Sequence, residues 1–413
     1  MKRTRTAAFL FWALTMSAFG AEQGTVLPNR IDLVRHDAPP LALPGPFSVG
    51  VQTLELSDPE RVDVLGTIER GSVVRDERRL TVEVWYPAVA QQDGAGTQYL
   101  TETRNLEVMA RLHGAAARDV EPLQGRGSFP LVILSHGYPG NRYLMSHLGE
   151  NLASKGYVVA SIDHTDSTYR NQQAFASTLY NRALDQRFVL QALATAGQTD
   201  GSFLQGIVDA DNTGLIGFSM GGYGLLNNLG ASYSEAMIEA NGAPPLGLLR
   251  EHTDASPAYR QGLDARIKAG VAIAPWGMNS GYFTPETLRA IHLPVLFVAG
   301  TVDATAGYEN GTRAIFENTT GAERTLLSFV NGGHSVAAPI PLPQEILATA
   351  DKSGAGHYAD AVWDSVRSNN ILAHYVTAFL DLHLKHMTER EAALREIPER
   401  SVGLLLEHRA AGE

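Results

Sequence analysis

The chain has 413 residues, of which 44% are hydrophobic and 19% charged, enough to bury a substantial core as one large domain with added segments. Its formal net charge of −11 argues against a nucleic-acid partner, because phosphates require a basic surface. Cysteine is absent, which excludes disulfides and a lipidated N-terminal cysteine, so the fold must rest on its core.

The first twenty residues have the composition of a secretory signal peptide. Three basic residues precede the apolar run 7–14, and Ala18 and Gly20 supply small residues at the positions that a signal peptidase recognises. We therefore expect residues 1–20 to be removed, cleavage to fall near Gly20, and the protein to be secreted or periplasmic. A retained membrane anchor is the alternative, and the apolar run is short for a bilayer.

Residues 21–127 begin with a proline-rich segment and contain two predicted strands. Residues 21–46 contain five prolines and predict an extended mature N-terminus. Strands are predicted over 47–56 and 80–86, the second with the alternation of an antiparallel edge strand. Residues 88–127 are irregular apart from a short helix predicted near 106–112.

From residue 129 onward, strand and helix patterns alternate regularly. The apolar run 129–134 predicts a buried strand, and helices predicted over 143–154 and 178–196 flank a strand over 157–162. This alternation predicts βαβ units, and therefore an α/β fold with a mostly parallel central sheet flanked by helices.

The segment Gly217-Phe218-Ser219-Met220-Gly221 follows an apolar run and opens a small apolar segment. A strand, a tight turn with serine at its apex and a helix together form a nucleophile elbow, in which the glycines let strand and helix approach closely. The GxSxG pattern alone is weak, since a plain glycine turn also produces it, so other residues have to support the assignment.

Two later segments supply an acid and a base in the order serine, acid, histidine that this fold requires. The apolar run 293–303 ends at Asp303, and a strand predicted over 326–330 leads to a glycine loop that carries His334. The imidazole would take the proton of Ser219, and the carboxylate would orient the imidazole. The alternatives are that Asp303 caps a helix and that His334 is a solvated loop histidine.

Other acidic residues are poorer candidates for the acid. Asp163 and Asp166 precede the serine in the chain, and Asp211 lies at the amino end of the strand that leads to it. The sequence Asp163-His164-Thr165-Asp166 also suggests a metal site, but a loop at the carboxyl end of a strand, near the rim of the active site, is the better interpretation.

The strand predicted over 129–134 runs into Ser135-His136-Gly137-Tyr138. The backbone N–H groups of Tyr138 and Met220 are the predicted oxyanion-hole donors, the second because it follows the nucleophile. His136 would stiffen the loop that presents Tyr138 more readily than act as a base, because it precedes the serine.

The series Ser135-His136-Gly137, residues 152–160 and residues 163–167 resembles the corresponding run of plasma-type platelet-activating-factor acetylhydrolases and their bacterial relatives, often grouped with dienelactone-hydrolase-like proteins. The serine elbow, Ala274-Pro275-Trp276 and the segment around Asp303 are similar to those of bacterial cutinases and polyester hydrolases. The resemblance covers roughly residues 75–340 and is specific for fold and triad, not for a substrate. Dienelactone hydrolysis itself is disfavoured, because it uses a cysteine nucleophile.

The resemblance implies an α/β-hydrolase fold with Ser219, Asp303 and His334 as the catalytic triad. It also implies that Trp276 lines a substrate pocket, with a core position as the alternative. Further candidates for substrate contact are Tyr282, Phe283 and His136.

We predict one hydrolase domain over residues 47–390. The remaining segments are interpreted as additions to it. Residues 231–266 form a helical insertion after the nucleophile helix, where hydrolases often carry a cap. Residues 369–385 predict an amphipathic helix, and 391–413 a C-terminal tail. His383 and His386 lack an acidic partner at a convincing spacing, so no metal site is predicted.

The leading hypothesis is a secreted serine esterase that cleaves a small, lipid or polyester ester through an acyl-enzyme on Ser219 and needs no metal or organic cofactor. A peptidase or amidase could use the same triad, and an inactive binding protein on a hydrolase fold is a third possibility. The sequence predicts no stable membrane anchor after cleavage and does not indicate an oligomeric state.

Overall fold

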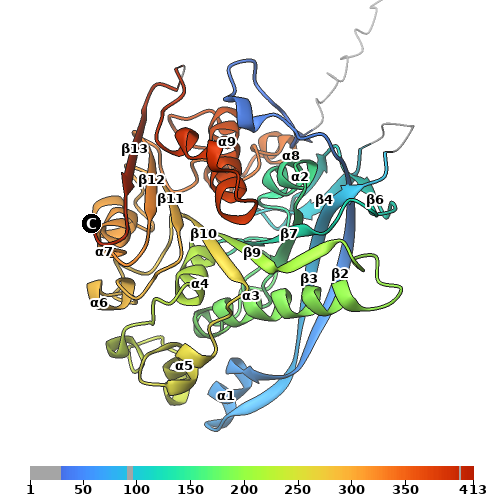
Figure 1. Ribbon diagram of the computed structural model, residues 1–413. Coiled ribbons are helices and arrows are strands. Elements are labelled where there is room, and N and C mark those ends of the chain that lie inside the picture. Colours follow the sequence, from blue (N-terminus) through green and yellow to red (C-terminus); the bar gives the residue numbers. More distant parts are fainter. Residues whose placement is uncertain (1–28, 91–95, 400) are drawn as a thin grey trace, which may run out of the picture.

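The computed structural model describes residues 29–90, 96–399 and 401–413 (Figure 1). Within these residues the central sheet has ten strands in the order β13-β12-β11-β10-β9-β7-β8-β3-β2-β6. The run from β12 to β8 is parallel throughout, whereas β13 and β3 pair antiparallel to their neighbours in that run. The predicted α/β fold with a mostly parallel sheet is therefore confirmed.

The strands of the central sheet are β2 (Ser48–Asp63), β3 (Val74–Ala88), β6 (Ala117–Arg118), β7 (Phe129–Ser135), β8 (Val158–Asp163), β9 (Val208–Phe218), β10 (Ile267–Ile273), β11 (Val295–Gly300), β12 (Arg324–Phe329) and β13 (Leu404–Arg409). A second, small sheet contains β1 (Asn29–Arg30), β5 (Met109–His113) and β4 (Gln98–Glu102) in that order.

The α-helices are α1 (Val64–Arg70), α2 (Ser146–Ser154), α3 (Phe175–Gln198), α4 (Met220–Asn228), α5 (Pro257–Gln261), α6 (Pro285–Leu288), α7 (Ala314–Asn318), α8 (Gln344–Ala348) and α9 (Ser365–Leu384). Short 3₁₀ helices are η1 (Pro40–Ala42), η2 (Glu235–Met237), η3 (Pro245–His252), η5 (Ala355–His357), η6 (Thr388–Arg390) and η7 (Ala392–Leu394), and η4 (Tyr308–Arg313) is a π-helical turn.

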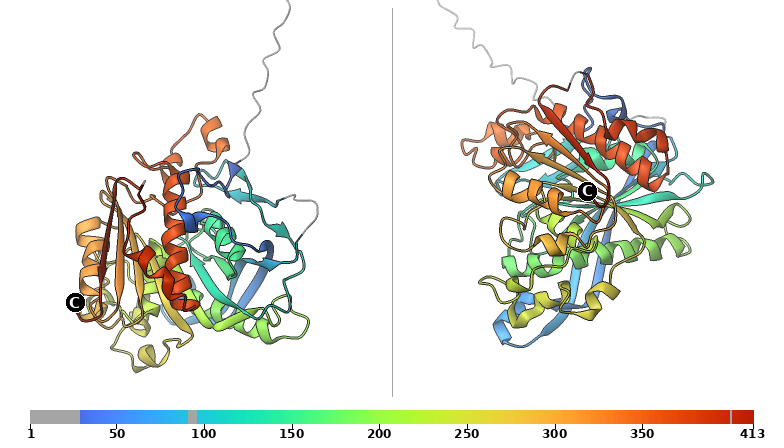
Figure 2. Two further views of the ribbon diagram at one scale, coloured as in Figure 1. Left: turned by 45° about the horizontal axis from the view of Figure 1, so that its top comes forward. Right: turned by 60° about the vertical axis from the view of Figure 1, so that its left-hand side comes forward.

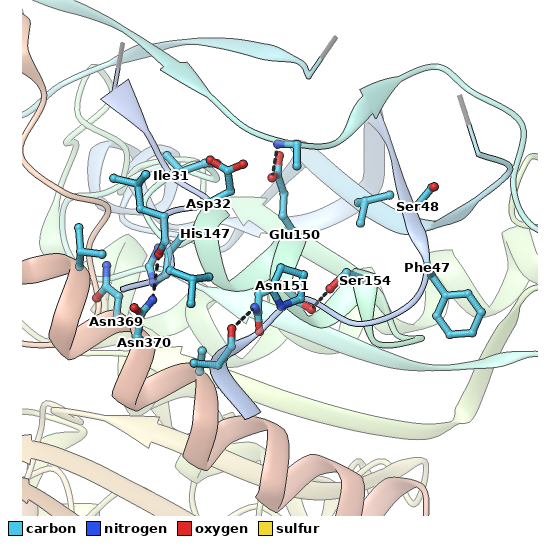
Figure 3. A pocket seen from close by; sticks show the side chains of 18 of the residues that line it. Ile31, Asp32, Phe47, Ser48, His147, Glu150, Asn151, Ser154, Asn369 and Asn370 are labelled. Carbon is cyan, nitrogen blue, oxygen red and sulfur yellow. Dashed lines mark hydrogen bonds between the residues drawn. The ribbon is translucent and has the colours of Figure 1, made fainter. Parts of the chain in front are cut away.

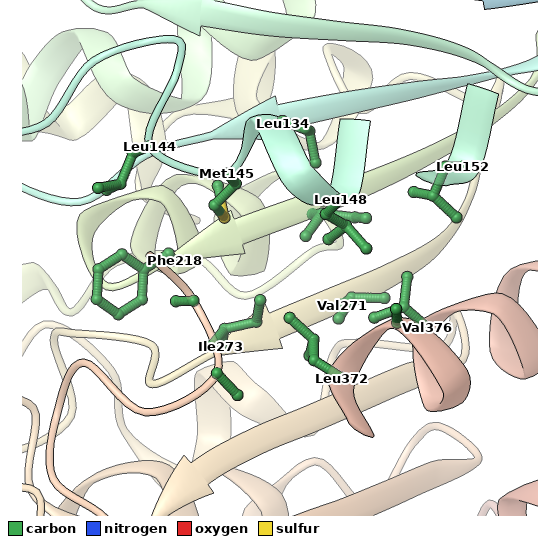
Figure 4. Close-up of a cluster of buried hydrophobic side chains, with 14 of the residues drawn as sticks. Leu134, Leu144, Met145, Leu148, Leu152, Phe218, Val271, Ile273, Leu372 and Val376 are labelled. Carbon is green, nitrogen blue, oxygen red and sulfur yellow. The ribbon is translucent and has the colours of Figure 1, made fainter. Parts of the chain in front are cut away.

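Helices cover both faces of the sheet, with α3 and α4 on one side and α2 and α9 on the other (Figure 2). Side chains alternate across a strand, so β7 places Leu131 and Ile133 in the core beneath α3 and α4. Its other face sends Leu134 into the second core, where the side chains of Leu148 from α2 and Leu372 from α9 meet it (Figure 4).

Two predictions for the segment 47–127 were wrong. Strand β3 lies inside the sheet between β2 and β8, not at an edge. The helix predicted near 106–112 is instead largely strand β5, which pairs with β4 as an antiparallel hairpin. Ala110 and Leu112 are buried while Met109 and Arg111 are exposed, which is the alternation of a half-buried strand.

The ends of the described chain are packed onto the domain. The N–H of Leu41 donates to His374 of α9, so the proline-rich segment is held against the body of the protein. The predicted C-terminal tail contains β13, which pairs with β12 and completes the sheet. The predicted signal peptide and residues 21–28 lie outside the described residues. In the part of the chain that the structure describes, no helix has the length and apolarity to cross a membrane.

Residues 231–266 form η2, η3 and α5, joined by loops. They pack on the helices of the α3/α4 face: the ring of Tyr233 stacks on Tyr223 of α4 at 4.2 Å, and the Tyr259 hydroxyl donates to the Asn227 carbonyl. The insertion is thus mostly loop and short helical turns, with little regular helix.

Candidate active site

Ser219 lies at the sharp turn between β9 and α4. Its backbone has φ 53° and ψ −113°, a conformation that costs energy for a residue with a side chain and that a nucleophile elbow requires. A Cβ on Gly221 would overlap the Ser135 carbonyl, and one on Gly217 would overlap the backbone of Gly221. Gly217 is therefore needed for α4 to approach the end of β9, and Gly221 for α4 to approach the end of β7.

The structure brings the three predicted triad residues together from the ends of three strands. His334 Nε2 lies 3.0 Å from Ser219 Oγ, and His334 Nδ1 lies 2.8 Å from Asp303 Oδ2. The other oxygen of Asp303 accepts the backbone N–H groups of Thr305 and Ala306, at 2.7 and 3.0 Å. These bonds fix the carboxylate, which in turn fixes the orientation of the imidazole.

The environment of Asp303 keeps its carboxyl group ionised. Burial alone would raise its pKa, but the hydrogen bond and charge interaction with His334 and the two backbone donors outweigh burial and lower the pKa below its ordinary value. An ionised carboxylate at this position can stabilise a positive charge that forms on His334 during a reaction.

The two predicted oxyanion donors flank the serine. Tyr138 follows Gly137, at which an added Cβ would meet the Cβ of Ser219 at 3.3 Å. Met220 is the first residue of α4, where a backbone N–H has no partner within its own helix. Both N–H groups are thus carried by segments that adjoin Ser219.

Ser219 and His334 open into a cavity of about 500 Å³. Residues 331–335 and 353–361 supply much of its wall, together with Arg104 from the loop after β4. Most of the lining side chains are polar or small, including Ser335, Ser353 and Asp360. The predicted cap, residues 231–266, does not line this cavity; the segment before α9 borders it instead.

Three predicted substrate contacts pack beside the serine without lining this cavity. Tyr282 and Phe283 are buried against Tyr223 of α4. Trp276 is half-buried and its ring also packs on Tyr223, while its backbone N–H donates to the Ser219 carbonyl. Their physical role in this structure is to support the turn that carries the serine.

His136, the fourth predicted contact, is buried beneath the loop and does not line the cavity. Its Nδ1 lies 2.6 Å from the Gly137 carbonyl, and its Nε2 accepts the N–H of His164. Burial, together with the neighbouring Arg182, lowers its pKa and keeps the ring neutral. These bonds tie the loop before Tyr138 to the loop of His164, and the stiffening role of His136 stays a prediction.

A second serine, histidine and aspartate cluster escaped the sequence analysis. His164 lies 2.8 Å from Ser135 Oγ and 3.0 Å from Asp185 Oδ2, and all three side chains are buried. Asp185 also pairs with Arg61 and Arg78. The signal in the sequence was Asp185, a charged residue on the side of α3 that is buried. Such a charge is rarely buried without partners.

The rival acids are held elsewhere. Asp163 pairs with Arg142, and Asp166 pairs with Arg78. Among the residues described here, no three histidine, aspartate or glutamate side chains gather in a way that could hold a metal ion. His383 packs its ring against Phe379.

The chain is similar to two groups of known proteins, platelet-activating factor acetylhydrolases and bacterial cutinases. Residues 40–191 match the family model described as platelet-activating factor acetylhydrolase, isoform II. The platelet-activating factor acetylhydrolase of Cavia porcellus is 35% identical over 98 residues, which are 21% of this chain and 22% of that protein. Cutinase est1 of Thermobifida alba is 24% identical over 209 residues, which are 50% of this chain and 54% of the cutinase. The chain therefore spans about half or less of the length of these relatives.

Among solved structures, a ferulic acid esterase from Streptomyces cinnamoneus matches with a TM-score of 0.61 and 22% identity, over 87% of this chain and 96% of the esterase. At that identity the likeness concerns the fold. The proteins that this chain resembles are carboxylic ester hydrolases. The chain is an α/β-hydrolase-fold protein similar to platelet-activating factor acetylhydrolases and to bacterial cutinases.

Proposed function

We propose that this protein is a serine hydrolase that cleaves carboxylic esters through an acyl-enzyme on Ser219. The observation that carries the proposal is the chain of contacts from Ser219 to His334 at 3.0 Å and from His334 to Asp303 at 2.8 Å, with Ser219 and His334 lining a cavity. The similarity to ester hydrolases supports the same reaction class.

In the proposed reaction, Ser219 Oγ attacks the ester carbonyl while His334 Nε2 takes the hydroxyl proton. The negative charge that develops on the carbonyl oxygen would be stabilised by the N–H groups of Tyr138 and Met220. His334 then gives its proton to the leaving alkoxide, and the acyl group remains on the serine. A water molecule activated by His334 releases the acid and restores the enzyme.

The cavity favours a short acyl group. A long acyl chain needs an extended apolar channel, whereas polar and small side chains such as Ser335, Ser353 and Asp360 form much of this wall. The similarity to a family named for acetyl hydrolysis supports the same choice. We therefore infer small, water-soluble esters with short acyl groups as the substrate class.

The proposal includes export from the cytoplasm. It rests on the basic residues, apolar run and small residues of positions 1–20, which have the order of a signal peptide. N-terminal sequencing of the protein recovered from the periplasm or medium tests it, with a new N-terminus near residue 21 as the expected result.

The decisive experiment measures hydrolysis of p-nitrophenyl esters from acetyl to palmitoyl by the wild type and by Ser219→Ala. We expect turnover to be highest for acetyl and butyryl esters and to vanish in the variant. A profile rising toward palmitoyl would contradict the short-acyl inference. Cleavage of p-nitroanilides with no cleavage of esters would favour an amidase, and failure of the wild type to react with a fluorophosphonate would favour a binding protein.

A further inference from the structure

A second cavity, of about 250 Å³, lies on the α2/α9 face of the sheet (Figure 3). Helix α2, the first half of α9 and residues 31–34 of the N-terminal segment form its walls. It shares no lining residue with the cavity at Ser219. At about 30 Å³ per water molecule in the liquid, it could hold roughly eight waters or one small organic molecule.

Two polar side chains of this cavity are buried without a hydrogen-bond partner. Neither ring nitrogen of His147 has one, although only 7% of the residue is exposed. The Oδ1 of Asn369 also lacks one, while the amide nitrogen of the same side chain donates to the Pro339 carbonyl at 2.9 Å. Buried polar groups are nearly always hydrogen-bonded, so these atoms are free to bind a ligand.

The neighbouring polar side chains are already engaged. Glu150 accepts the Tyr99 hydroxyl at 2.5 Å and the N–H of Ala115 at 2.7 Å. Asn370 accepts the N–H of Arg35 and donates to the Leu33 carbonyl. The free hydrogen-bonding capacity that the described lining offers is therefore concentrated at His147 and Asn369.

The charges of the cavity exclude an anion. Asp32 and Glu150 line it, and no lysine or arginine stands among its described lining residues. Burial lowers the pKa of His147 to about 3, so the imidazole is neutral at pH 7 and has one N–H donor and one acceptor nitrogen. Asn369 Oδ1 adds a second acceptor.

The rest of the wall is largely apolar, with Ile31, Val34, Val49, Val366 and Ala373 among its side chains. Apolar walls around a few fixed polar groups are the usual composition of a small-molecule site. A hydroxyl group matches the polar end, because it can donate to Asn369 Oδ1 or to the acceptor nitrogen of His147 and accept from the imidazole N–H.

We propose that this cavity is a second ligand site, which binds an uncharged amphiphile made of an apolar body and a hydroxyl head. The head bonds His147 and Asn369, and the body packs on the aliphatic walls. Because a ligand in this site needs the folded arrangement of α2, α9 and the N-terminal segment, it stabilises the folded protein by an amount that grows with ligand concentration. The proposal is independent of ester hydrolysis at Ser219.

The test uses three probes with the same eight-carbon chain: 1-octanol, octanoate and octylammonium. Each is titrated into the full chain at pH 7 while the melting temperature and ligand-observed NMR signals are recorded. With 1-octanol alone, we expect a melting temperature that rises with the logarithm of ligand concentration above the Kd, and an NMR binding signal that saturates. A larger rise with octanoate or octylammonium would overturn the neutral head group, and no rise with any probe would show a cavity that holds only water.

Variants locate the bound octanol. Ala373→Phe fills the cavity from α9 and should abolish the shift, whereas His147→Leu and Asn369→Leu keep the cavity and should each weaken octanol binding about tenfold, the factor for one lost hydrogen bond of about 1.4 kcal/mol. The circular-dichroism spectrum and a cooperative thermal transition report whether each variant is folded. An octanol shift of parent size in a folded Ala373→Phe protein would place the binding elsewhere and overturn the proposal.

Discussion

Ser135 Oγ lies 2.8 Å from Nε2 of His164, so this chain contains two serine, histidine and aspartate arrangements of similar geometry. Their surroundings differ. Ser219 opens into a cavity, whereas Ser135 is completely buried at the end of β7 and its histidine is covered as well. Burial with neighbouring Arg182 lowers the pKa of His164 to about 3 despite the carboxylate of Asp185, so that ring serves as a neutral link under the loop of Tyr138.

The first prediction separates the two serines. Ser219→Ala should lower kcat at least about 10⁴-fold on p-nitrophenyl acetate with unchanged folding, because the attacking oxygen is lost. Ser135→Ala should keep kcat within about tenfold but lose about 1–3 kcal/mol of stability, because His164 Nε2 becomes an unpaired buried atom. Steady-state kinetics and urea unfolding of both variants provide the check, and equal loss of activity in the two would contradict the assignment.

The second prediction concerns Asp303. Asp303→Asn preserves the size of the side chain but removes the charge that stabilises a protonated His334. The new amide can also donate a hydrogen bond to His334 Nδ1, which favours the tautomer that cannot accept the serine proton at Nε2. We expect kcat to fall about 10³- to 10⁴-fold with little change in KM or secondary structure. Asp163→Asn is a matched control, since that carboxylate pairs with Arg142 outside the proposed triad. A drop of the same size in the control would assign the loss to general disruption.

The third prediction concerns the glycine after the elbow. Gly221→Ala places a Cβ where it overlaps the Ser135 carbonyl, so β7 and α4 must separate. The variant should be destabilised by several kcal/mol and should not hydrolyse esters. Gly201→Ala is the comparison, because its Cβ would meet nothing within 4 Å, although its positive φ carries a modest strain. Thermal unfolding of the two variants distinguishes steric overlap from backbone strain.

The features that could be predicted from the sequence are those that local patterns determine. The order of Ser219, Asp303 and His334 follows from three strand ends that a parallel sheet brings to one edge, so their convergence could be expected from spacing alone. The walls of the cavity could not. Arg104 and residues 353–361 approach Ser219 only through long-range packing, and no local pattern indicates which loops border a site.

The same limit explains the incorrect expectations. The segment 106–112 is too short for its apolar positions to separate period 2 from period 3.6, and pairing with β4 decides for a strand. The surroundings of Trp276, Tyr282 and Phe283 also depend on long-range packing, because Tyr223 and Tyr233 fill the space around them.

The fourth prediction concerns the charge at the cavity rim. Arg104 is exposed and lines the cavity, so it can attract an anionic group on a substrate. In Arg104→Gln, KM for 4-acetoxybenzenesulfonate should rise about fivefold, equivalent to about 1 kcal/mol for a solvent-exposed charge pair. Phenyl acetate, which lacks the charge, should keep its KM. Equal changes for both esters would assign Arg104 a structural role.

The last prediction uses His147 to relate burial to acid stability. Burial lowers its pKa from 6.5 in the unfolded chain to about 3 in the folded protein. Between these values the unfolded state binds the additional proton, so the free energy of unfolding falls as the pH falls. One such group contributes a slope of about 1.4 kcal/mol per pH unit. His147→Leu should therefore flatten the dependence by about that amount between pH 6 and pH 4.

Urea unfolding at half-unit intervals over this range measures the slope for the wild type, His147→Leu and His292→Leu. His292 is exposed in the folded protein, so its replacement controls for the loss of a histidine without the loss of a buried one. Other buried histidines, including His252 and His164, also have a pKa near 3, so the wild-type slope should exceed that of a single group. If His147→Leu kept the full wild-type slope, the ring would be reached by protons in the folded state, and the cavity around it would be filled with water.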